Sequence, residues 1–288
     1  MNNEVSPVVQ SLLLRNELVR HRKKKGLTQE QVARELEWSS AKLIRIEGGR
    51  SPLSKTDLQV LLAQYGVVED SEVERLQNLA RDARRSAWWQ AYRHEISDNY
   101  LAYIGYEAGA SFIRQVQDSA IPGLLQTEDY ARMYSSEVFE GVNSEMVVKF
   151  RLRRQDELNH RTRPPRQSFL LDEAVIRRHV GIKVDREIMP TQLRRLVEEG
   201  RDGHVEIAVI PFGAGAHPGM KGPFTLLEFD GDLGDILYLE GSGTSETITG
   251  EDPRIAAYRA AFEQLRAEAL PSEESLTLIE QIADEMSG

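Results

Sequence analysis

Residues 27–50, LTQEQVARELEWSSAKLIRIEGGR, constrain the fold of this chain more than any other segment. Thr28 begins a capping box with the glutamine three residues later, which predicts the start of a short helix. Ser39 is a favourable N-cap for a second short helix, and the pair Gly48-Gly49 ends it. The segment therefore predicts two helices joined by a tight turn, which is a helix-turn-helix.

The charge of the chain is distributed unevenly around this segment. The first fifty residues carry 10 Lys and Arg against 6 Asp and Glu, a balance of +4. The other 238 residues carry a balance of −14, and the two together give the net charge of −10. A basic region at one end of an acidic chain favours binding of a polyanion there. Lys42 and Arg45 lie on the second helix of the motif, so the pattern predicts a helix-turn-helix that reads DNA.

Length and composition limit the alternatives. A chain of 288 residues fits two domains, each with its own core. The absence of cysteine excludes disulfides and thiolate sites and suits a reducing cytosol. No apolar run approaches the roughly 20 residues that span a bilayer, and MNNEVSPVVQSLLL lacks the basic region of a signal peptide. We expect a soluble, cytoplasmic protein that associates with the nucleoid when it binds DNA.

Further helices flank the motif. Leu14 and Leu18 lie one helical turn apart, and Gly26 is placed to end their helix. After the motif, Ser54 begins a helix with an apolar stripe that Gly66 closes. We therefore expect a compact all-α DNA-binding bundle over residues 8–68.

Residues 69–95 are predicted to form a connector helix. Val73, Leu76 and Leu79 share one face of it, and the pair Trp88-Trp89 follows. We interpret the two tryptophans as a packing anchor rather than a ligand cage. No Gly-, Ser- or Pro-rich linker occurs here, so a stiff connection is expected.

Residues 96–284 have a mixed pattern that predicts an α+β domain with a small sheet. VEIAVIPF at 205–212 alternates like a strand, GPFTLLEF and DILYLE flank a turn like a hairpin, and SFLLDEAVIRRHVG reads as a strand that leads into a helix. Asp252 and Pro253 begin a long helix, and Ser272 begins the last one. The predicted fold class is thus multidomain, with an all-α bundle followed by an α+β domain.

The second domain shows no pattern typical of catalysis. Asp172 and Glu173 are adjacent, so on a helix they diverge instead of converging as an acid/base pair. GAGAHPG fits neither a dinucleotide fingerprint nor a P-loop, and the histidines lack the spacing of metal ligands. We expect no catalytic residues, no cofactor and no metal.

Over residues 12–68 the chain resembles the XRE (Cro/CI, phage-repressor-like) helix-turn-helix family, and LTQEQVA and RIEGGR carry the resemblance. Two departures are Glu37, where the turn usually has glycine, and the short Ser40 and Ala41, where longer readers are common. These two departures leave open which DNA sequence the helix prefers. The resemblance implies a structural ion pair between Arg22 and Glu47. It also implies these contacts with DNA: Gln29 with backbone phosphate, Ser40, Ala41 and Arg45 with base edges, and Lys42 with phosphate or base. Ser39 and Arg50 are further candidate DNA-binding residues.

The second domain is similar to the DUF5753 domain over about residues 97–282. IPGLLQTEDYAR, RLRRQDEL, LLDEAVIRRHVG, VIPFGAGAHPGMKGPFTLLEF and ILYLEG carry this resemblance, in that order. The family resembles WhiJ-like developmental regulators of filamentous bacteria, also described as antitoxin-like transcriptional regulators. The resemblance implies that the domain binds a small DUF397-type protein encoded nearby, a signal, or both. Its candidate contact residues are Gln126, Thr127 and Arg132 on a polar surface, and His217 and Lys221 on a loop expected to be exposed.

These observations lead to one main hypothesis and two alternatives. We expect a homodimeric, sequence-specific regulator that binds double-stranded DNA at a pseudo-palindromic operator, with half-sites about one DNA turn apart. The first alternative is an antitoxin-like protein that mainly sequesters its small partner. The second is a small-molecule sensor with a closed pocket in the second domain.

Overall fold

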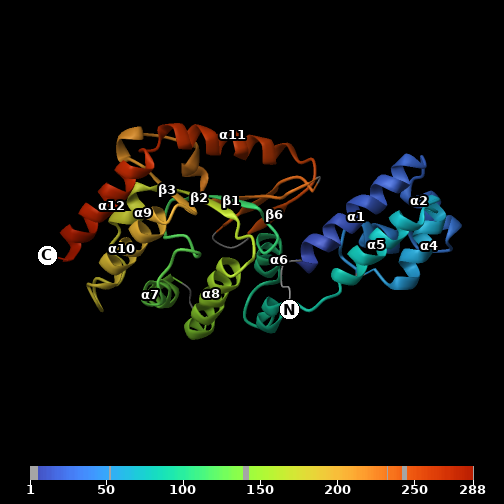
Figure 1. Cartoon of the computed structure of the whole chain (residues 1–288), viewed down its shortest axis with the longest axis horizontal. Helices are drawn as coiled ribbons and strands as arrows, with labels where there is room; N and C mark the ends of the chain where they lie inside the picture. The colour runs from blue at the N-terminus through green and yellow to red at the C-terminus, as the bar shows by residue number, and fades with distance from the viewer. Residues whose placement is uncertain (1–5, 52, 139–142, 232, 242–244, 288) are drawn as a thin grey trace. The chain divides into compact units, whose positions relative to one another are not determined.

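The structure is a computed structural model that describes residues 6–51, 53–138, 143–231, 233–241 and 245–287. The chain divides into two compact units, Met1–Gln90 and Ala91–Gly288, here called unit 1 and unit 2 (Figure 1). Unit 1 is helical and unit 2 combines helices with a six-stranded sheet, which confirms the predicted fold class. Among the described residues, no helix has both the length and the apolar character needed to cross a membrane.

Unit 1 consists of helices that begin where the sequence places capping residues. The side chains of Thr28, Ser39 and Ser54 each accept a hydrogen bond from the backbone N–H three residues later. The core is apolar, and Leu18, Leu43 and Leu61 are fully buried in it. The helices are α1 (Pro7–Lys24), α2 (Gln29–Glu35), α3 (Ser40–Glu47), α4 (Lys55–Tyr65) and α5 (Asp70–Asp82), followed by a short 3-10 helix (Trp88–Tyr92).

Helix α5 lies within the segment predicted as a connector, but it packs into unit 1. It contacts α1 and α4. Leu76 is fully buried, and Ala80 is nearly so, in the same apolar core as Leu18. The helical bundle of unit 1 therefore includes one more helix than the predicted range 8–68.

Unit 2 is built on a mixed sheet with the strand order β3-β2-β1-β4-β5-β6. β1, β2 and β3 are parallel, and β4, β5 and β6 are antiparallel additions on the other side of β1. The predicted hairpin is formed by β4 and β5, although Asp232 in its turn lies outside the described residues. The strands are β1 (Phe112–Gln117), β2 (Arg166–Asp172), β3 (Val205–Ile210), β4 (Phe224–Glu228), β5 (Ile236–Leu239) and β6 (Glu246–Ile248).

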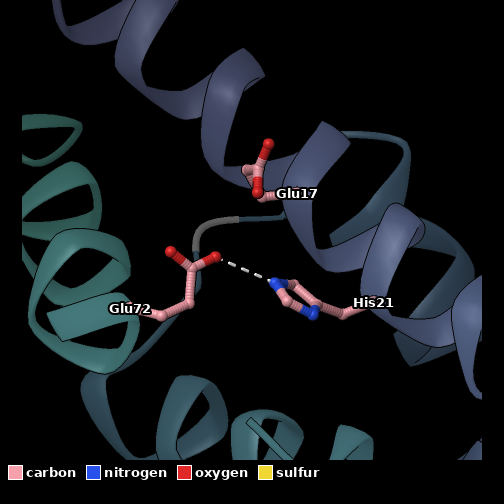
Figure 2. Close-up of side chains that lie close together, drawn as sticks. All are labelled: Glu17, His21 and Glu72. Carbon is pink, nitrogen blue, oxygen red and sulfur yellow. Dashed lines mark hydrogen bonds and ion pairs between the residues drawn. The ribbon is translucent and has the colours of Figure 1, made fainter. Parts of the chain in front are cut away.

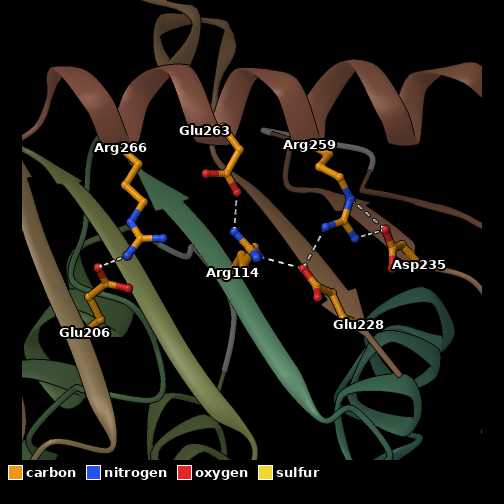
Figure 3. A network of polar contacts seen from close by, with 7 residues as sticks. All are labelled: Arg114, Glu206, Glu228, Asp235, Arg259, Glu263 and Arg266. Atoms are coloured by element: carbon orange, nitrogen blue, oxygen red, sulfur yellow. Dashed lines mark hydrogen bonds and ion pairs between the residues drawn. The ribbon is translucent and has the colours of Figure 1, made fainter. Parts of the chain in front are cut away.

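Helix α11 (Pro253–Glu268) covers one face of the sheet (Figure 1). Phe262 and Leu265 are fully buried against sheet residues that include Val116. Ion pairs lie around the apolar contact between α11 and the sheet (Figure 3). They join Arg114 to Glu228 and Glu263, Arg259 to Asp235 and Glu228, and Arg266 to Glu206.

Helices α6 (Asp98–Glu107), α7 (Glu128–Val138) and α8 (Ser144–Asn159) lie on the opposite side of the sheet from α11 (Figure 1). A buried ion pair joins α8 to α6, because Arg154 Nε donates to Glu107 Oε1 at 2.6 Å and both side chains are at most 5% exposed. Burial alone would lower the pKa of Arg154, but the adjacent Glu107 raises it well above its usual value. Unit 2 also contains α9 (Glu173–Arg177), α10 (Ile188–Arg201) and α12 (Ser272–Ser287), and short 3-10 helices at Phe212–Ala214 and Pro218–Lys221.

Candidate nucleic-acid interface

The turn between α2 and α3 depends on Glu37. Its φ of 54° makes it the one non-glycine residue with positive φ among the described residues. The left-handed conformation is unfavourable for a residue with a Cβ and is the reason that glycine is preferred in such turns. Trp38 N closes the turn by donating to Ala33 O at 2.7 Å. The departure at Glu37 thus keeps the geometry of the turn but introduces backbone strain.

A buried ion pair fixes the end of α3 to α1. Arg22 Nε and Nη2 donate to Glu47 Oε1 and Oε2 at 2.7 and 2.8 Å, with the side chains 11% and 4% exposed. A third nitrogen, Arg22 Nη1, donates to Leu27 O at 2.9 Å at the start of the motif. The hydrogen bond to Glu47 raises the pKa of Arg22, so its guanidinium stays charged. Arg22 and Glu47 therefore have the bracing role that the family resemblance implies.

Gln29 also belongs to this brace. Its Nε2 donates to Glu47 Oε2 at 2.7 Å, and Tyr65 Oη donates to Glu47 Oε1 at 3.4 Å. Burial raises the pKa of Tyr65, so its hydroxyl remains a donor. In this structure the amide nitrogen of Gln29 orients the carboxylate of Glu47, and its expected contact with phosphate stays a prediction.

Lys42 has an anion within unit 1. Its Nζ lies 2.7 Å from Asp57 Oδ1 on α4 and 3.6 Å from the centre of the Trp38 ring. Burial alone would raise the pKa of Asp57, but hydrogen bonds from Lys42 and Ser54 bring it below its usual value. A lysine in the first turn of a helix needs a nearby negative charge to offset the macrodipole. Asp57 supplies that charge.

The outward face of α3 consists of Ser40, Ala41, Ile44 and Arg45, which are exposed. Ser39 is used as the N-cap, and Arg50 is exposed beyond the end of the helix. Within the described part of the chain, the side chain of Arg45 makes neither a hydrogen bond nor an ion pair, so its guanidinium is free to contact a ligand. A short helix with a free arginine on an unobstructed face has the shape and chemistry of a major-groove reader.

Ile44 was not among the predicted contact residues, yet it is 45% exposed on the same face. The signal was available, because burial of Leu43 and Ile46 directs the two residues between them outward. An exposed isoleucine beside a free arginine offers an apolar contact of the kind that thymine methyl groups make.

Glu17, His21 and Glu72 form a second polar cluster, between α1 and α5 (Figure 2). Their potential ligand atoms lie within 4.8 Å of one another, and His21 Nε2 is 3.0 Å from Glu72 Oε1. Arg75 already binds both carboxylates, with contacts of 2.6 Å to Glu17 and 2.8 Å to Glu72. The hydrogen bond from Arg75 lowers the pKa of Glu72 to about 2. Arg20 also pairs with Glu17, so two guanidiniums balance the two carboxylates, and the evident role of the cluster is to join α5 to α1.

Gln126, predicted to lie on a polar surface of unit 2, is instead 2% exposed. Its Nε2 donates to Ile121 O at 2.8 Å, and therefore it stabilises the loop before α7. Thr127 also has a local role, since its N–H donates to Gln192 Oε1 and its hydroxyl accepts from Tyr130 N at the start of α7. The surface prediction for Gln126 was wrong because the loop folds inward.

Arg132 and the loop residues have different surroundings. Arg132 is half-exposed and pairs with Glu128, Asp129 and Glu145. His217 was expected on an exposed loop, but its side chain is 5% exposed and its Nε2 lies 3.3 Å from Asp172 Oδ2. That expectation was wrong because the loop packs against the end of β2. Lys221 is exposed, as expected.

Comparison with protein-family models matches residues 13–76 to a helix-turn-helix domain. It matches residues 100–281 to a domain of unknown function, DUF5753. No curated protein and no solved structure matches the chain. The first match extends into α5, in agreement with the packing of that helix in unit 1, and the second covers more than half of the chain.

Proposed function

The chain belongs to the DUF5753 family, and we propose that it is a transcriptional regulator of the XRE type that binds specific sites on double-stranded DNA through α3. The helix-turn-helix domain makes it a DNA-binding regulator. The observation that carries the more specific proposal is the outward face of α3, where Arg45 is exposed and unpaired among the described residues. Arginine is the residue that most often reads guanine in the major groove.

The other basic side chains near α3 are suited to contacts with the DNA backbone and not with the bases. Arg50 is exposed beyond the helix and is suited to a phosphate contact, whereas Lys42 is held by Asp57 and would reach DNA only by leaving that carboxylate. Arg45 therefore supplies discrimination between sequences, and the basic surroundings supply affinity.

The proposal includes a homodimer. Proteins that present one recognition helix per subunit bind two half-sites about one DNA turn apart, ~34 Å, and a two-fold dimer therefore selects a pseudo-palindrome. We assign the protein to the cytoplasm and, when bound to DNA, to the nucleoid.

Unit 2 is proposed to receive a signal, and a small DUF397-type protein is its first candidate partner. Two large apolar side chains on the loops after β3 support a protein partner, because Phe212 is 60% exposed and Met220 is 68% exposed. We propose a binding role for unit 2 in place of catalysis. Asp172 and Glu173 have separate partners, His217 for the first and Arg177 for the second, which does not suit paired acid/base work.

The DNA-binding proposal is tested with the full chain and duplexes selected from a random library. Arg45→Ala should reduce the ratio of affinities for the selected and a scrambled duplex by about 10- to 100-fold, the equivalent of about 1–3 kcal/mol. Arg34→Ala is the matched control, since Arg34 is an exposed arginine on α2. It should leave that ratio unchanged. Equal losses on both duplexes for Arg45→Ala would contradict the assigned role.

The antitoxin-like alternative is favoured by the exposed Phe212 and Met220 and makes a separate prediction. The full chain should co-purify with a small DUF397-type protein and change its affinity for the selected duplex when that protein is added. A Phe212→Ser, Met220→Ser variant should lose the complex and keep its affinity for DNA. If this variant retains the complex, the partner does not bind at these residues.

A further inference from the structure

A cavity of about 810 Å³ lies within unit 2, where β1 and β2 end. Its floor is a row of three side chains across the sheet, since Gln115 of β1 is paired with Thr225 of β4, which is paired with Tyr238 of β5. Its walls include Tyr100 of α6, Tyr134 of α7 and Arg151 of α8. Ligands of sheets with parallel strands commonly bind at the carboxyl ends of those strands.

The floor of the cavity is polar where a sheet that faces helices would ordinarily be apolar. Gln115 is 7% exposed, and its Oε1 is buried without a hydrogen-bond partner in the described part of the chain. Ile113, two residues earlier on the same face of β1, is fully buried and apolar. A buried amide oxygen without a donor is unfavourable for folding. Its place in the floor of a cavity indicates that a ligand supplies the donor.

Arg151 adds a positive charge to the wall. Its Nη1 donates to Gln126 Oε1 at 2.9 Å and to Ser135 Oγ at 3.0 Å, which are both neutral acceptors. No carboxylate lies within ion-pair distance of Arg151 among the described residues, whereas Arg154, one turn away on α8, is neutralised by Glu107. A half-buried guanidinium that lacks a counter-charge favours an anionic ligand group.

Three carboxylates, those of Asp118, Asp172 and Glu240, also line the cavity, but beyond ion-pair distance of Arg151, so the preference for an anion is local to Arg151. Asp172 is held by His217, and Glu240 accepts a hydrogen bond from Gln117 at 3.3 Å. Asp118 is half-exposed and can accept from a donor on a ligand. Lys221 is exposed and also lines the cavity, where it adds a second positive charge.

We propose that this cavity binds a small organic anion with a flat ring. Its carboxylate or phosphate pairs with Arg151, an N–H or O–H group donates to Gln115 Oε1, and the ring contacts the tyrosine side chains of the walls. The inference rests on the signal-binding role proposed for unit 2. It does not depend on DNA binding, so the two can fail separately.

The test is isothermal titration calorimetry, in which each of three probes is titrated into the full chain without DNA. Indole-3-acetate represents a carboxylate with a ring and an N–H donor, adenosine monophosphate represents a phosphate with both, and inorganic phosphate represents the anion alone. At least one ring-bearing probe should bind at millimolar concentration or below and more tightly than phosphate. The probe that binds identifies the anionic group. Failure of both ring-bearing probes at about 5 mM would overturn the proposal.

Variants at Arg151 locate the site. Arg151→Gln should weaken binding at least about tenfold, because it removes the charge and the paired donors. Arg153→Gln is the matched control, since Arg153 lies on the same helix, is exposed, and is absent from the lining of the cavity. It should bind the probe like the unaltered protein. Equal effects of the two substitutions would overturn the assignment of the site.

Gln115→Leu separates a ligand contact from a structural role. Leucine has a similar size and removes the unpaired oxygen, so the unliganded protein should melt at the same or a higher temperature. The same variant should bind the probe at least about tenfold more weakly. A lower melting temperature without ligand would show that the amide is already satisfied within the fold, and this result would overturn the proposal. Arg45→Ala changes a proposed DNA contact in unit 1, so this variant should bind the probe like the unaltered protein.

Discussion

Lys42 Nζ on α3 lies 2.7 Å from Asp57 Oδ1 on α4, and the two side chains are 36% and 22% exposed. Among the described residues the ammonium therefore has one anionic partner, and a DNA phosphate would compete with it. A partly exposed ion pair of this kind contributes about 1 kcal/mol or less to stability, so exchange between the two partners costs little. Asp57 would thus reduce the electrostatic attraction between α3 and DNA.

Asp57→Asn should strengthen binding to all duplexes alike. The change frees Lys42 and removes a negative charge beside α3, so affinity for selected and scrambled duplexes should rise by about three- to tenfold at low salt. Fluorescence anisotropy at several salt concentrations measures this change. The slope of log K against log salt should steepen by up to about 1. Glu74→Gln changes net charge equally at an exposed site on α5, and an equal gain for this variant would show that only net charge matters.

Glu37→Gly should stabilise unit 1. Glu37 has a φ of 54°, and glycine adopts this conformation without the steric penalty of a Cβ. After allowance for the larger backbone entropy of glycine in the unfolded chain, the gain in unfolding free energy should be about 1 kcal/mol. Urea unfolding followed by circular dichroism measures it. Arg34→Gly, a glycine within α2, should instead cost about 1 kcal/mol, and a loss of similar size for Glu37→Gly would contradict the interpretation.

The parts of unit 1 that could be predicted from the sequence are those set by neighbouring residues. Thr28, Ser39 and Ser54 determine where helices begin through contacts three residues away, and the alternation of buried and exposed positions on α3 follows from helix geometry. The partner of Lys42 could not be predicted in this way. Asp57 is fifteen residues away, and only the packing of α4 against α3 brings it close.

The cavity of unit 2 was not predictable for a similar reason. The side chains of β1, FIRQVQ, alternate between the two faces of the sheet. Gln115 and Gln117 are polar although they lie on the face that α6, α7 and α8 cover. Polar residues on an alternating strand ordinarily indicate the solvent side. Only the strand order, with β1 at the centre and helices over that face, shows that these amides are buried. His217 is a second example, because its burial depends on Asp172 of another segment.

Acid should weaken unit 1 through Glu72. Its pKa is about 2 in the folded protein and near 4.5 when unfolded, so its contribution to stability is complete above about pH 5.5 and is lost as the pH falls from 4.5 towards 2. Because the side chain is 24% exposed, this contribution should be about 1 kcal/mol or less. Thermal unfolding of the unaltered protein and of Glu72→Gln should differ at pH 7 and converge as the pH falls towards 2. A difference that stays constant with pH would rule out titration of Glu72 as the cause.

Glu107→Gln should severely destabilise unit 2. The substitution leaves Arg154, which is 5% exposed, as a buried charge without a counter-charge, and such changes cost about 3–5 kcal/mol. Calorimetry of the full chain should show a large fall in the melting temperature of unit 2. Glu246→Gln is the control, because it removes an ion pair to Arg254 in which both side chains are about half exposed. It should cost less than about 1 kcal/mol.

A double variant distinguishes loss of the pair from loss of packing. Glu107→Gln combined with Arg154→Met removes both charges and replaces the guanidinium by an apolar side chain, so it should regain most of the stability that Glu107→Gln alone loses. The hydroxyl of Tyr103, which donates to Glu107 at 2.9 Å, can then donate to the oxygen of the new amide. If the double variant were as unstable as the single one, the damage would come from disturbed packing around α6 and not from the uncompensated arginine.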